Sequence, residues 1–563
     1  MTPRSATPPP RPSLLARFGP LTAILVAIGL IAVLASTGRD DEVATDTTIE
    51  AGGTNDRLPI YWADAEADET TTGVDWGSKC DPDTGRVQVP SVYAPPCAVA
   101  RPGIEGGATY QGVTADTVKV VLYQPADDDL SAVLQAQADS AEDRIANEEA
   151  MIQMLAARYE TWGRTIETVI LKGRGSDETN ARADAVKVAT EIGAFASIGS
   201  PGQESAYAEE LASRGVLCVG CGLSVPDTTF QKFAPYLWGN LQTPEQYLLT
   251  MGDVVIGQLN GKPAIHAGDP AMHDKKRVFG AVNFEQDPPV FTGTANMVAE
   301  RGKALGYESK VRITYQLVIA ELAEKARSII TQLKKEGVTT VIFLGDPIMP
   351  IYLTQAATDQ DYYPEWVITG TVLTDTTAMG RRYDQTQWAH AFGISSLPAR
   401  LPLEQGESYR LHDWFYGTPP PGTKTAGLVY EPIRVFMLGV HMAGPDLTPE
   451  TFRDGLFAYP PSGGTPTAPQ ISFGDHGYFD APDFQAVDDM QLIWWDAEAT
   501  GKDEQGIDGT GMMRFMDGGR RYLPGGAEGL DDRYFDEAGT VIGYPEEPPG
   551  EAPPQYPSPA PGN

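Results

Sequence analysis

The stretch Phe195–Ser224, FASIGSPGQESAYAEELASRGVLCVGCGLS, decides the fold expected for this chain. A short apolar run, Phe195–Ile198, leads into a Gly-Ser-Pro-Gly loop and a helix-like segment that stops at Gly215. A second apolar run, Val216–Val219, ends in another loop of small residues. This order of strand, loop, helix, strand and loop is typical of a parallel sheet, in which ligands bind beyond the carboxyl ends of the strands. The first loop, Ser200–Ser205, also opens a helix, and the free N–H groups there suit a carboxylate.

Length and charge restrict the class of protein. A chain of 563 residues is too long for one hydrophobic core, so we expect at least two compact lobes. The formal net charge of -34 argues against nucleic acid as a partner, because phosphate binding requires a basic surface. Such a charge suits a soluble, exposed protein whose copies repel one another.

No motif for catalysis or metal binding is present. The sequence has no GxSxG, no P-loop and no HExxH, so we predict neither an enzyme nor a cofactor. His266 and His273 lie seven residues apart in a polar loop, and we interpret them as solvated loop residues because a metal site needs three or four converging ligands. We therefore predict no metal site.

The N-terminal region predicts a membrane anchor. Residues 18–37 carry no charge, and a helix of about 20 residues spans one hydrocarbon core. Arginines precede this segment and acidic residues follow it, which places residues 1–17, a disordered tail, in the cytoplasm and the rest of the chain outside. We expect an extracytoplasmic protein tethered by this helix, with a cleaved signal peptide and secretion as the alternative.

Four cysteines suit an oxidising compartment. Cys80 and Cys97 lie in one Pro/Gly-rich stretch and are expected to close a modest loop. Cys218 and Cys221 form a CxxC at the end of a strand, beyond disulfide reach if the strand stays extended but close enough if Gly220 turns the chain. The pair is therefore a structural bridge, two buried thiols, or a redox motif, although a redox motif favours a helix N-terminus.

The alternation of strands and helices occurs twice. Strands are expected at Val118–Tyr123 and Ile166–Leu171 before the opening stretch, and the pattern restarts with a strand at Arg277–Val282. Two successive blocks of this kind predict an α/β fold of two doubly wound parallel-sheet lobes. Late elements are a buried helix at Gly427–Ala443 and a last strand at Met490–Trp495, and residues 543–563 are expected to be disordered.

The order of motifs resembles the type I periplasmic binding proteins, the leucine/isoleucine/valine-binding family of ABC transporter substrate-binding proteins. The similarity spans roughly residues 112–500. It is carried by GVTADTVKV near the start, the opening stretch, GVTTVIFLGDPIMPIYLTQA, LVYEPIRVFMLGVHMAGPDLTPETFRDGLF and ISFGDHGYFDAPDFQAVDDMQLIWW. Each motif is weak alone, and their order and spacing are what make the resemblance specific.

The resemblance implies two lobes joined by a hinge, closing on a ligand like a Venus flytrap. The first lobe is expected at residues 112–240 and 371–445, and the second at 241–370 and 446–500. Residues 38–111 are then a spacer with a possible disulfide, and 501–563 a Gly/Pro/acidic C-terminal extension.

The resemblance also implies ligand-binding positions. In the first lobe, the positions that hold a ligand carboxylate fall at Gln203, Glu204 and Ser205 and at Gly222, Leu223 and Ser224. In the second lobe the positions implied to contact the ligand in other ways fall at Phe284, Glu285, Asp346 and Thr371. The family acid that pairs with a ligand amine is replaced by Thr371, so Asp346 or Glu285 is expected to supply the charge. Each residue also has a plain structural interpretation: Asp346 precedes a proline and fits a turn, and Glu204 and Ser205 fit a helix start.

The function implied is that of an extracytoplasmic solute-binding protein. It captures a small polar organic solute, such as an amino acid or an amide, and presents it to an ABC-type permease. Two alternatives are a sensory or scaffold ectodomain that kept the fold, and a thiol oxidoreductase using Cys218 and Cys221.

Overall fold

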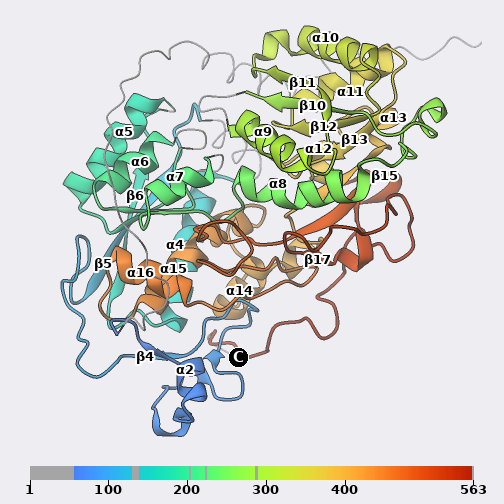
Figure 1. The fold of residues 1–563 in the computed structure, drawn as a ribbon. Helices are drawn as coiled ribbons and strands as arrows, with labels where there is room; N and C mark the ends of the chain where they lie inside the picture. The colour runs from blue at the N-terminus through green and yellow to red at the C-terminus, as the bar shows by residue number, and fades with distance from the viewer. Residues whose placement is uncertain are drawn as a thin grey trace, which may run out of the picture.

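The computed structural model describes residues 56–129, 139–175, 177–201, 205–221, 225–285 and 290–560. Two β-sheets organise these residues into two lobes (Figure 1). The first sheet has five parallel strands in the order β6-β5-β7-β8-β9. Their bounds are β5 Thr117–Gln124, β6 Thr165–Lys172, β7 Ala196–Ile198, β8 Leu217–Val219 and β9 Leu237–Trp238.

The second sheet has eight strands and repeats the order of the first. Its parallel part is β11-β10-β12-β13-β14, and β15, β16 and β17 extend it in antiparallel fashion. The bounds are β10 Phe279–Phe284, β11 Ser309–Tyr315, β12 Thr340–Leu344, β13 Glu365–Ile368, β14 Ala391–Ser395, β15 Met490–Lys502, β16 Asp508–Phe515 and β17 Arg521–Tyr522. In both sheets the chain places its second strand at the edge, then its first, third, fourth and fifth. The predicted fold of two doubly wound lobes is confirmed.

Helices connect the strands of each sheet. In the first block these are α4 Ala141–Arg158, α5 Glu178–Lys187, η2 Val188–Ile192, α6 Ala206–Ser213 and α7 Asp227–Lys232. In the second block they are α8 Pro244–Gly252, η3 Asp253–Leu259, α9 Val290–Lys303, α10 Leu322–Lys335, α11 Met349–Asp359, α12 Thr377–Gly380 and α13 Gln385–Trp388. The Ser140 hydroxyl accepts the N–H of Asp143 and caps α4. Residues 130–138 lie outside the described part.

Capping chemistry fixes the start of α8, which carries the chain from the first lobe into the second. Thr243 and Gln246 form a reciprocal capping box, and Pro244 occupies the first turn, where its missing N–H costs nothing. Gln246 also donates through Nε2 to Asp483 Oδ1 at 2.8 Å, which ties this crossing to another segment that passes between the lobes.

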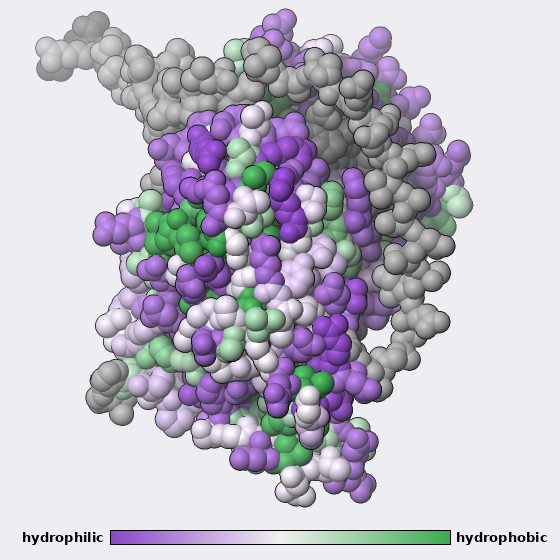
Figure 2. Space-filling view, turned by 90° about the vertical axis from the view of Figure 1, so that its left-hand side faces the viewer, coloured by the Kyte–Doolittle hydropathy of each residue, from purple (hydrophilic) through white to green (hydrophobic). Residues whose placement is uncertain are grey.

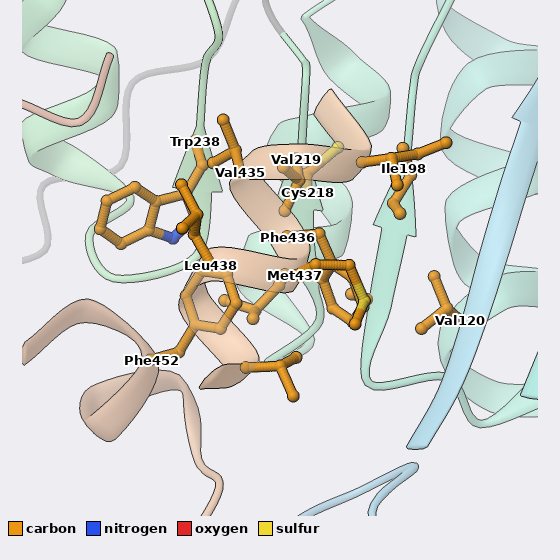
Figure 3. Close-up of a cluster of buried hydrophobic side chains, with 14 of the residues drawn as sticks. Val120, Ile198, Cys218, Val219, Trp238, Val435, Phe436, Met437, Leu438 and Phe452 are labelled. Carbon is orange, nitrogen blue, oxygen red and sulfur yellow. The ribbon is translucent and has the colours of Figure 1, made fainter. Parts of the chain in front are cut away.

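Two late helices complete the first lobe. α15 Ala426–Ala443 lies against the first sheet, with Val435, Phe436 and Leu438 among strand side chains such as Val120 and Ile198 (Figure 3). α16 Pro449–Phe457 places Phe452 at 5.7 Å from the ring of Trp238. The expected lobe boundaries are corrected here: α16 belongs to the first core, although 446–500 was expected in the second lobe, and β14 belongs to the second sheet, although 371–445 was expected in the first. Sequence order does not reveal which of two similar sheets a segment joins.

The C-terminal extension is ordered and packs on both lobes. β15 continues seven residues past the expected end at Trp495 and pairs with β16. Ala527 and Tyr534 are buried in the core of the second lobe. Further on, Trp414 donates its indole N–H to the carbonyl of Tyr556 at 3.0 Å. The expectation of a disordered tail is wrong for residues 543–560. Aromatic side chains of the folded body, such as Trp414, contact this Pro-rich segment and hold it in place.

The N-terminal segment is also part of the first lobe rather than a detached spacer. Tyr61, Val89 and Tyr93 are buried in the first core, and the Tyr61 hydroxyl donates to the carbonyl of Met442 at 2.5 Å. Cys80 and Cys97 form the expected disulfide. The predicted membrane helix at 18–37 lies outside the described residues, and none of the described helices is long and apolar enough to cross a membrane.

The surface on the side of the first lobe is mainly hydrophilic, with apolar residues in separate patches (Figure 2). This pattern agrees with the acidic composition and with exposure to water.

The two disulfides are expected to contribute differently to stability. Cys80 and Cys97 are 17 residues apart, whereas Cys218 and Cys221 are three apart. Loop-closure entropy then predicts a loss of about 3 kcal/mol for Cys80→Ala with Cys97→Ala, and about 2 kcal/mol for the Cys218→Ala, Cys221→Ala pair. Urea unfolding without reductant measures both, and a larger loss for the second pair would contradict this ranking.

Candidate functional site

The carboxyl ends of the parallel strands define the candidate site. In each sheet these ends lie on one edge, and the loops that leave them are the ones that the sequence singled out. The arrowheads of β10 and β11 point toward the first lobe (Figure 1). The edge of the second sheet therefore faces the first lobe.

A disulfide braces the edge of the first sheet. Cys218 and Cys221 are bonded, with their Cα atoms 5.8 Å apart, because Gly220 adopts a left-handed conformation at φ 70° and turns the chain. Cys221 Sγ also lies 3.5 Å from the carbonyl oxygen of Gly199, the residue after β7. The bridge thus fixes the origins of both predicted ligand loops.

Most predicted first-lobe contacts lie outside the described residues: Gln203, Glu204, Gly222, Leu223 and Ser224. Ser205 is described, directly before α6, and its hydroxyl bonds Glu209 Oε1 at 3.1 Å. Ser205 therefore stands where the sequence predicted a helix start, and its contact with a ligand remains a prediction.

The second-lobe candidates are linked by direct contacts. The Phe284 and Tyr315 rings are 5.8 Å apart, and the Tyr315 hydroxyl donates to the carboxylate of Asp346. Gly345, beside Asp346, donates its N–H to the Thr371 hydroxyl at 3.1 Å. The structure thus brings Phe284, Asp346 and Thr371 into one cluster with Tyr315, which the sequence analysis missed because a tyrosine at a strand end is indistinguishable from a core residue.

Asp346 holds the turn that leads into α11. Its Oδ1 accepts the N–H groups of Ile348 at 2.7 Å and Met349 at 2.9 Å, at the start of α11. Burial raises the pKa of this carboxyl, and the hydrogen bonds from Tyr315 and from the helix start oppose that rise. The structural interpretation of Asp346 as a turn residue is therefore realised, and its contact with a ligand remains a prediction.

Thr371 leads into a strained, apolar rim. Val372 and Leu373 have positive φ angles of 41° and 63°, which L-residues with a large side chain rarely adopt. Their side chains are nonetheless 45% and 48% exposed. Strain in two exposed apolar residues at a strand end is typical of a site shaped for contact with another molecule.

Asn283 and Glu285 flank the ring of Phe284 at the end of β10. Asn283 is 1% exposed, and its Oδ1 has no hydrogen-bond partner among the described residues. The N–H of Glu285 donates to the carbonyl of Tyr315 at 2.8 Å, which keeps its side chain at the sheet edge. A buried amide oxygen without a partner is costly, so Asn283 is a further candidate contact.

Asp375 is a second functional candidate that the sequence analysis missed. It is 5% exposed and accepts the hydroxyl of Ser395, the last residue of β14, at 2.5 Å. Burial raises the pKa of Asp375 to about 7, and the nearby Glu504 carboxylate adds to that rise. The sequence does carry a signal for Asp375, an acid a few residues past a strand end. The ligand-binding position at this strand end was assigned to Thr371 instead.

The thiol oxidoreductase alternative finds little support in the geometry. Cys218 and Cys221 are 0% and 2% exposed, and the bridge ends a strand instead of starting a helix. A redox disulfide must meet a substrate thiol, so a buried pair of this kind favours the structural role.

Comparison with known proteins gives a partial result. No protein-family model matches the chain, and no curated protein matches it. A solute-binding protein of an ABC transporter from R. palustris, solved in complex with 4-hydroxybenzoate, is similar at 13% identity and a TM-score of 0.49, over 74% of this chain and 99% of that one.

Two further solved structures belong to the same class of protein. An amino acid ABC transporter substrate-binding protein from Pseudomonas fluorescens is 12% identical at a TM-score of 0.48, over 74% of this chain and 98% of its own. A branched-chain amino acid transporter substrate-binding protein from Streptococcus pneumoniae, solved with isoleucine, is 13% identical at 0.46, over 71% and 99%. This is the class that the sequence resembles. These TM-scores lie below 0.5, so the fold is assigned from the strand order of the two sheets.

The raised pKa of Asp375 predicts a pH effect on stability. Its folded pKa of about 7 lies above the ordinary 3.8, so folding retains a proton and stability falls as pH rises from about 4 to 7. Asp375→Asn keeps a neutral acceptor for Ser395 and removes this loss. We expect the variant to gain stability over the natural chain across that interval, and chemical unfolding at several pH values measures it.

The exposed Asp413 provides the control, since Asp413→Asn removes the same charge where no burial acts. A constant difference between the Asp375→Asn variant and the natural chain from pH 4 to 8 would contradict the assignment.

Proposed function

We propose that this chain is an extracytoplasmic solute-binding protein that holds a small polar organic solute, such as an amino acid or an amide, between its two lobes. The solute binds by non-covalent contacts alone, and closure of the lobes forms the surface that an ABC-type permease recognises. The N-terminal helix tethers the protein to the outer side of the cell membrane.

The observation that carries the proposal is the rim of the second sheet. Asp346, Thr371 and the exposed Val372 and Leu373 lie on consecutive strand ends, where open α/β sheets bind ligands. Polar groups fix the orientation of a solute, and exposed apolar side chains gain contact when the lobes close over it.

A cationic group of the solute is expected to meet Glu285 and not Thr371 or Asp375. The Thr371 hydroxyl is hydrogen-bonded to Gly345 and Thr369. The buried Asp375 has a pKa of about 7, so its carboxyl group is largely neutral at mildly acidic pH. Glu285 is then the described carboxylate at this edge that is best placed to meet a cationic group.

A scaffold or sensory ectodomain is the second candidate. One observation favours it: the hydrogen-bonding groups of Asp346 and Thr371 are already used within the protein. An ectodomain of this kind needs no solute, and direct binding measurements distinguish the two candidates.

Isothermal titration against amino acids, small amides and carboxylic acids tests the proposal, together with mass spectrometry of solute released from protein purified under native conditions. We expect one chemical class to bind with 1:1 stoichiometry. The absence of heat across the panel, with no retained solute, would favour the scaffold instead.

The predicted first-lobe contacts supply a sharper test once a solute is found. Gln203→Ala with Ser224→Ala removes side chains that the family positions assign to the ligand, so we expect affinity to fall at least about tenfold. Ser213→Ala, at the exposed end of α6, is the matched control and should leave affinity unchanged. Equal affinity in all three proteins would place the solute elsewhere.

A further inference from the structure

A groove separate from the strand ends lies along α8, η3 and α9 of the second lobe. Its volume is about 300 Å³, at the lower end of the range for small-molecule sites. Three parts of the chain form it: the two helices, the loop that carries Tyr478 and Asp480, and the C-terminal extension around Pro524 and Glu528. None of the predicted ligand-binding residues lines it.

The floor of the groove is apolar. Leu248, Met297 and Val298 contribute side chains from the facing helices, and Ile256 and Leu305 extend this surface. Leu305 is 62% exposed, the most exposed of the large apolar side chains in the described part of the chain. An occupant with a hydrocarbon body gains by covering this surface.

The charged groups around this floor are mostly acidic. Glu245, Asp253, Asp480 and Glu528 line the groove, and the basic residue among the lining side chains, Arg301, is already paired with Asp480. Glu528 lies across Gly257, with its Cγ 3.0 Å from where a Cβ of that glycine would stand. Among the described residues no ion pair involves Glu245, Asp253 or Glu528, so three carboxylates border an apolar surface of small-molecule size.

The helix itself is distorted at this point. After α8 the backbone continues as a π-helix from Asp253 to Leu259, a form that is rare and often found at functional sites. Asp253 begins this segment, and its Oδ2 accepts the N–H of Gly525 at 2.8 Å, which ties the extension to the groove. Burial raises the pKa of Asp253 to about 6, and the neighbouring Glu528 adds to that rise.

We propose that the α8–α9 groove is a second binding site, for an organic cation that carries one ammonium group on an apolar body. The body covers Leu248, Met297 and Leu305, and the ammonium lies between Asp253 and Glu528. A cation there relieves the repulsion between these two carboxylates, which an uncharged or anionic molecule of the same shape does not.

Titration calorimetry on the full-length chain at pH 7.5 tests the site with three probes of similar shape: 2-phenylethylammonium, 2-phenylethanol and 3-phenylpropanoate. We expect the ammonium to bind at least about tenfold more tightly than the alcohol, and the carboxylate least tightly. The same difference should appear as a higher midpoint of thermal unfolding with the ammonium. Equal binding of ammonium and alcohol would overturn the proposal, as would the absence of binding.

Variants assign the binding to this groove. Asp253→Asn with Glu528→Gln removes both charges while keeping an acceptor for Gly525, and should weaken ammonium binding at least about tenfold. Glu300→Gln with Glu308→Gln removes two exposed charges outside the groove and should leave binding unchanged. If the first pair has no effect, or if Thr371→Val abolishes ammonium binding, the ammonium occupies another site and the proposal fails.

A pH series adds an independent check. Affinity for the ammonium should fall as the pH is lowered from 7.5 to 5, because Asp253 takes up a proton. The other charged groups that face the groove are Glu245, Glu528 and the Arg301–Asp480 pair. Affinity that does not change over this interval would contradict a role for Asp253.

Discussion

In a parallel sheet the carboxyl ends of all the strands lie on one edge, and the rest of this molecule depends on that constraint. The chain builds two such sheets with the same strand order and passes between them more than once. Loops of small residues, a disulfide, strained residues and buried acids all gather at the two edges. Beyond the strand ends the backbone N–H and C=O groups no longer pair within the sheet, so other contacts have to hold the chain there.

The sequence predicted the architecture because its continuous apolar runs mark the strands directly. Continuous apolar runs such as Val118–Tyr123 and Met490–Trp495 predicted buried strands, and the structure has β5 and β15 at those positions. The assignment of late segments failed for a physical reason. α16 and β14 carry ordinary apolar patterns, and only packing, as between Phe452 and Trp238, decides which core each one joins.

The candidate site was predictable in position but not in detail. Strand ends are visible in a sequence, and Asp346, Thr371 and Phe284 do lie together there. Tyr315 and Asp375 were missed, because the contacts that single them out, of Tyr315 with Asp346 and of Asp375 with Ser395, form only when separate segments of the chain meet. Loop residues such as Gln203 and Ser224 follow from family resemblance alone, so their role is still a prediction.

The C-terminal extension joins the two lobes. Arg521, from the extension, pairs with Asp489 at 2.7 Å and donates to the carbonyl of Ser396 at 2.8 Å, holding two segments that run between the lobes. Both ion-pair partners are buried, and breaking such a pair leaves an uncompensated charge, so this contact resists separation of the segments. Any movement of one lobe relative to the other therefore has to occur around crossings that the extension restrains.

The central claim is that a solute binds between the carboxyl edges of the two sheets. A crystal structure of the protein, purified from its native host with its solute retained, tests this most directly. The account predicts electron density for a small organic molecule between the loops after β7 and β8 and the rim at Thr371, Val372 and Leu373. Well-ordered lobes closed on each other with side chains filling that space, and no room for a solute, would contradict it.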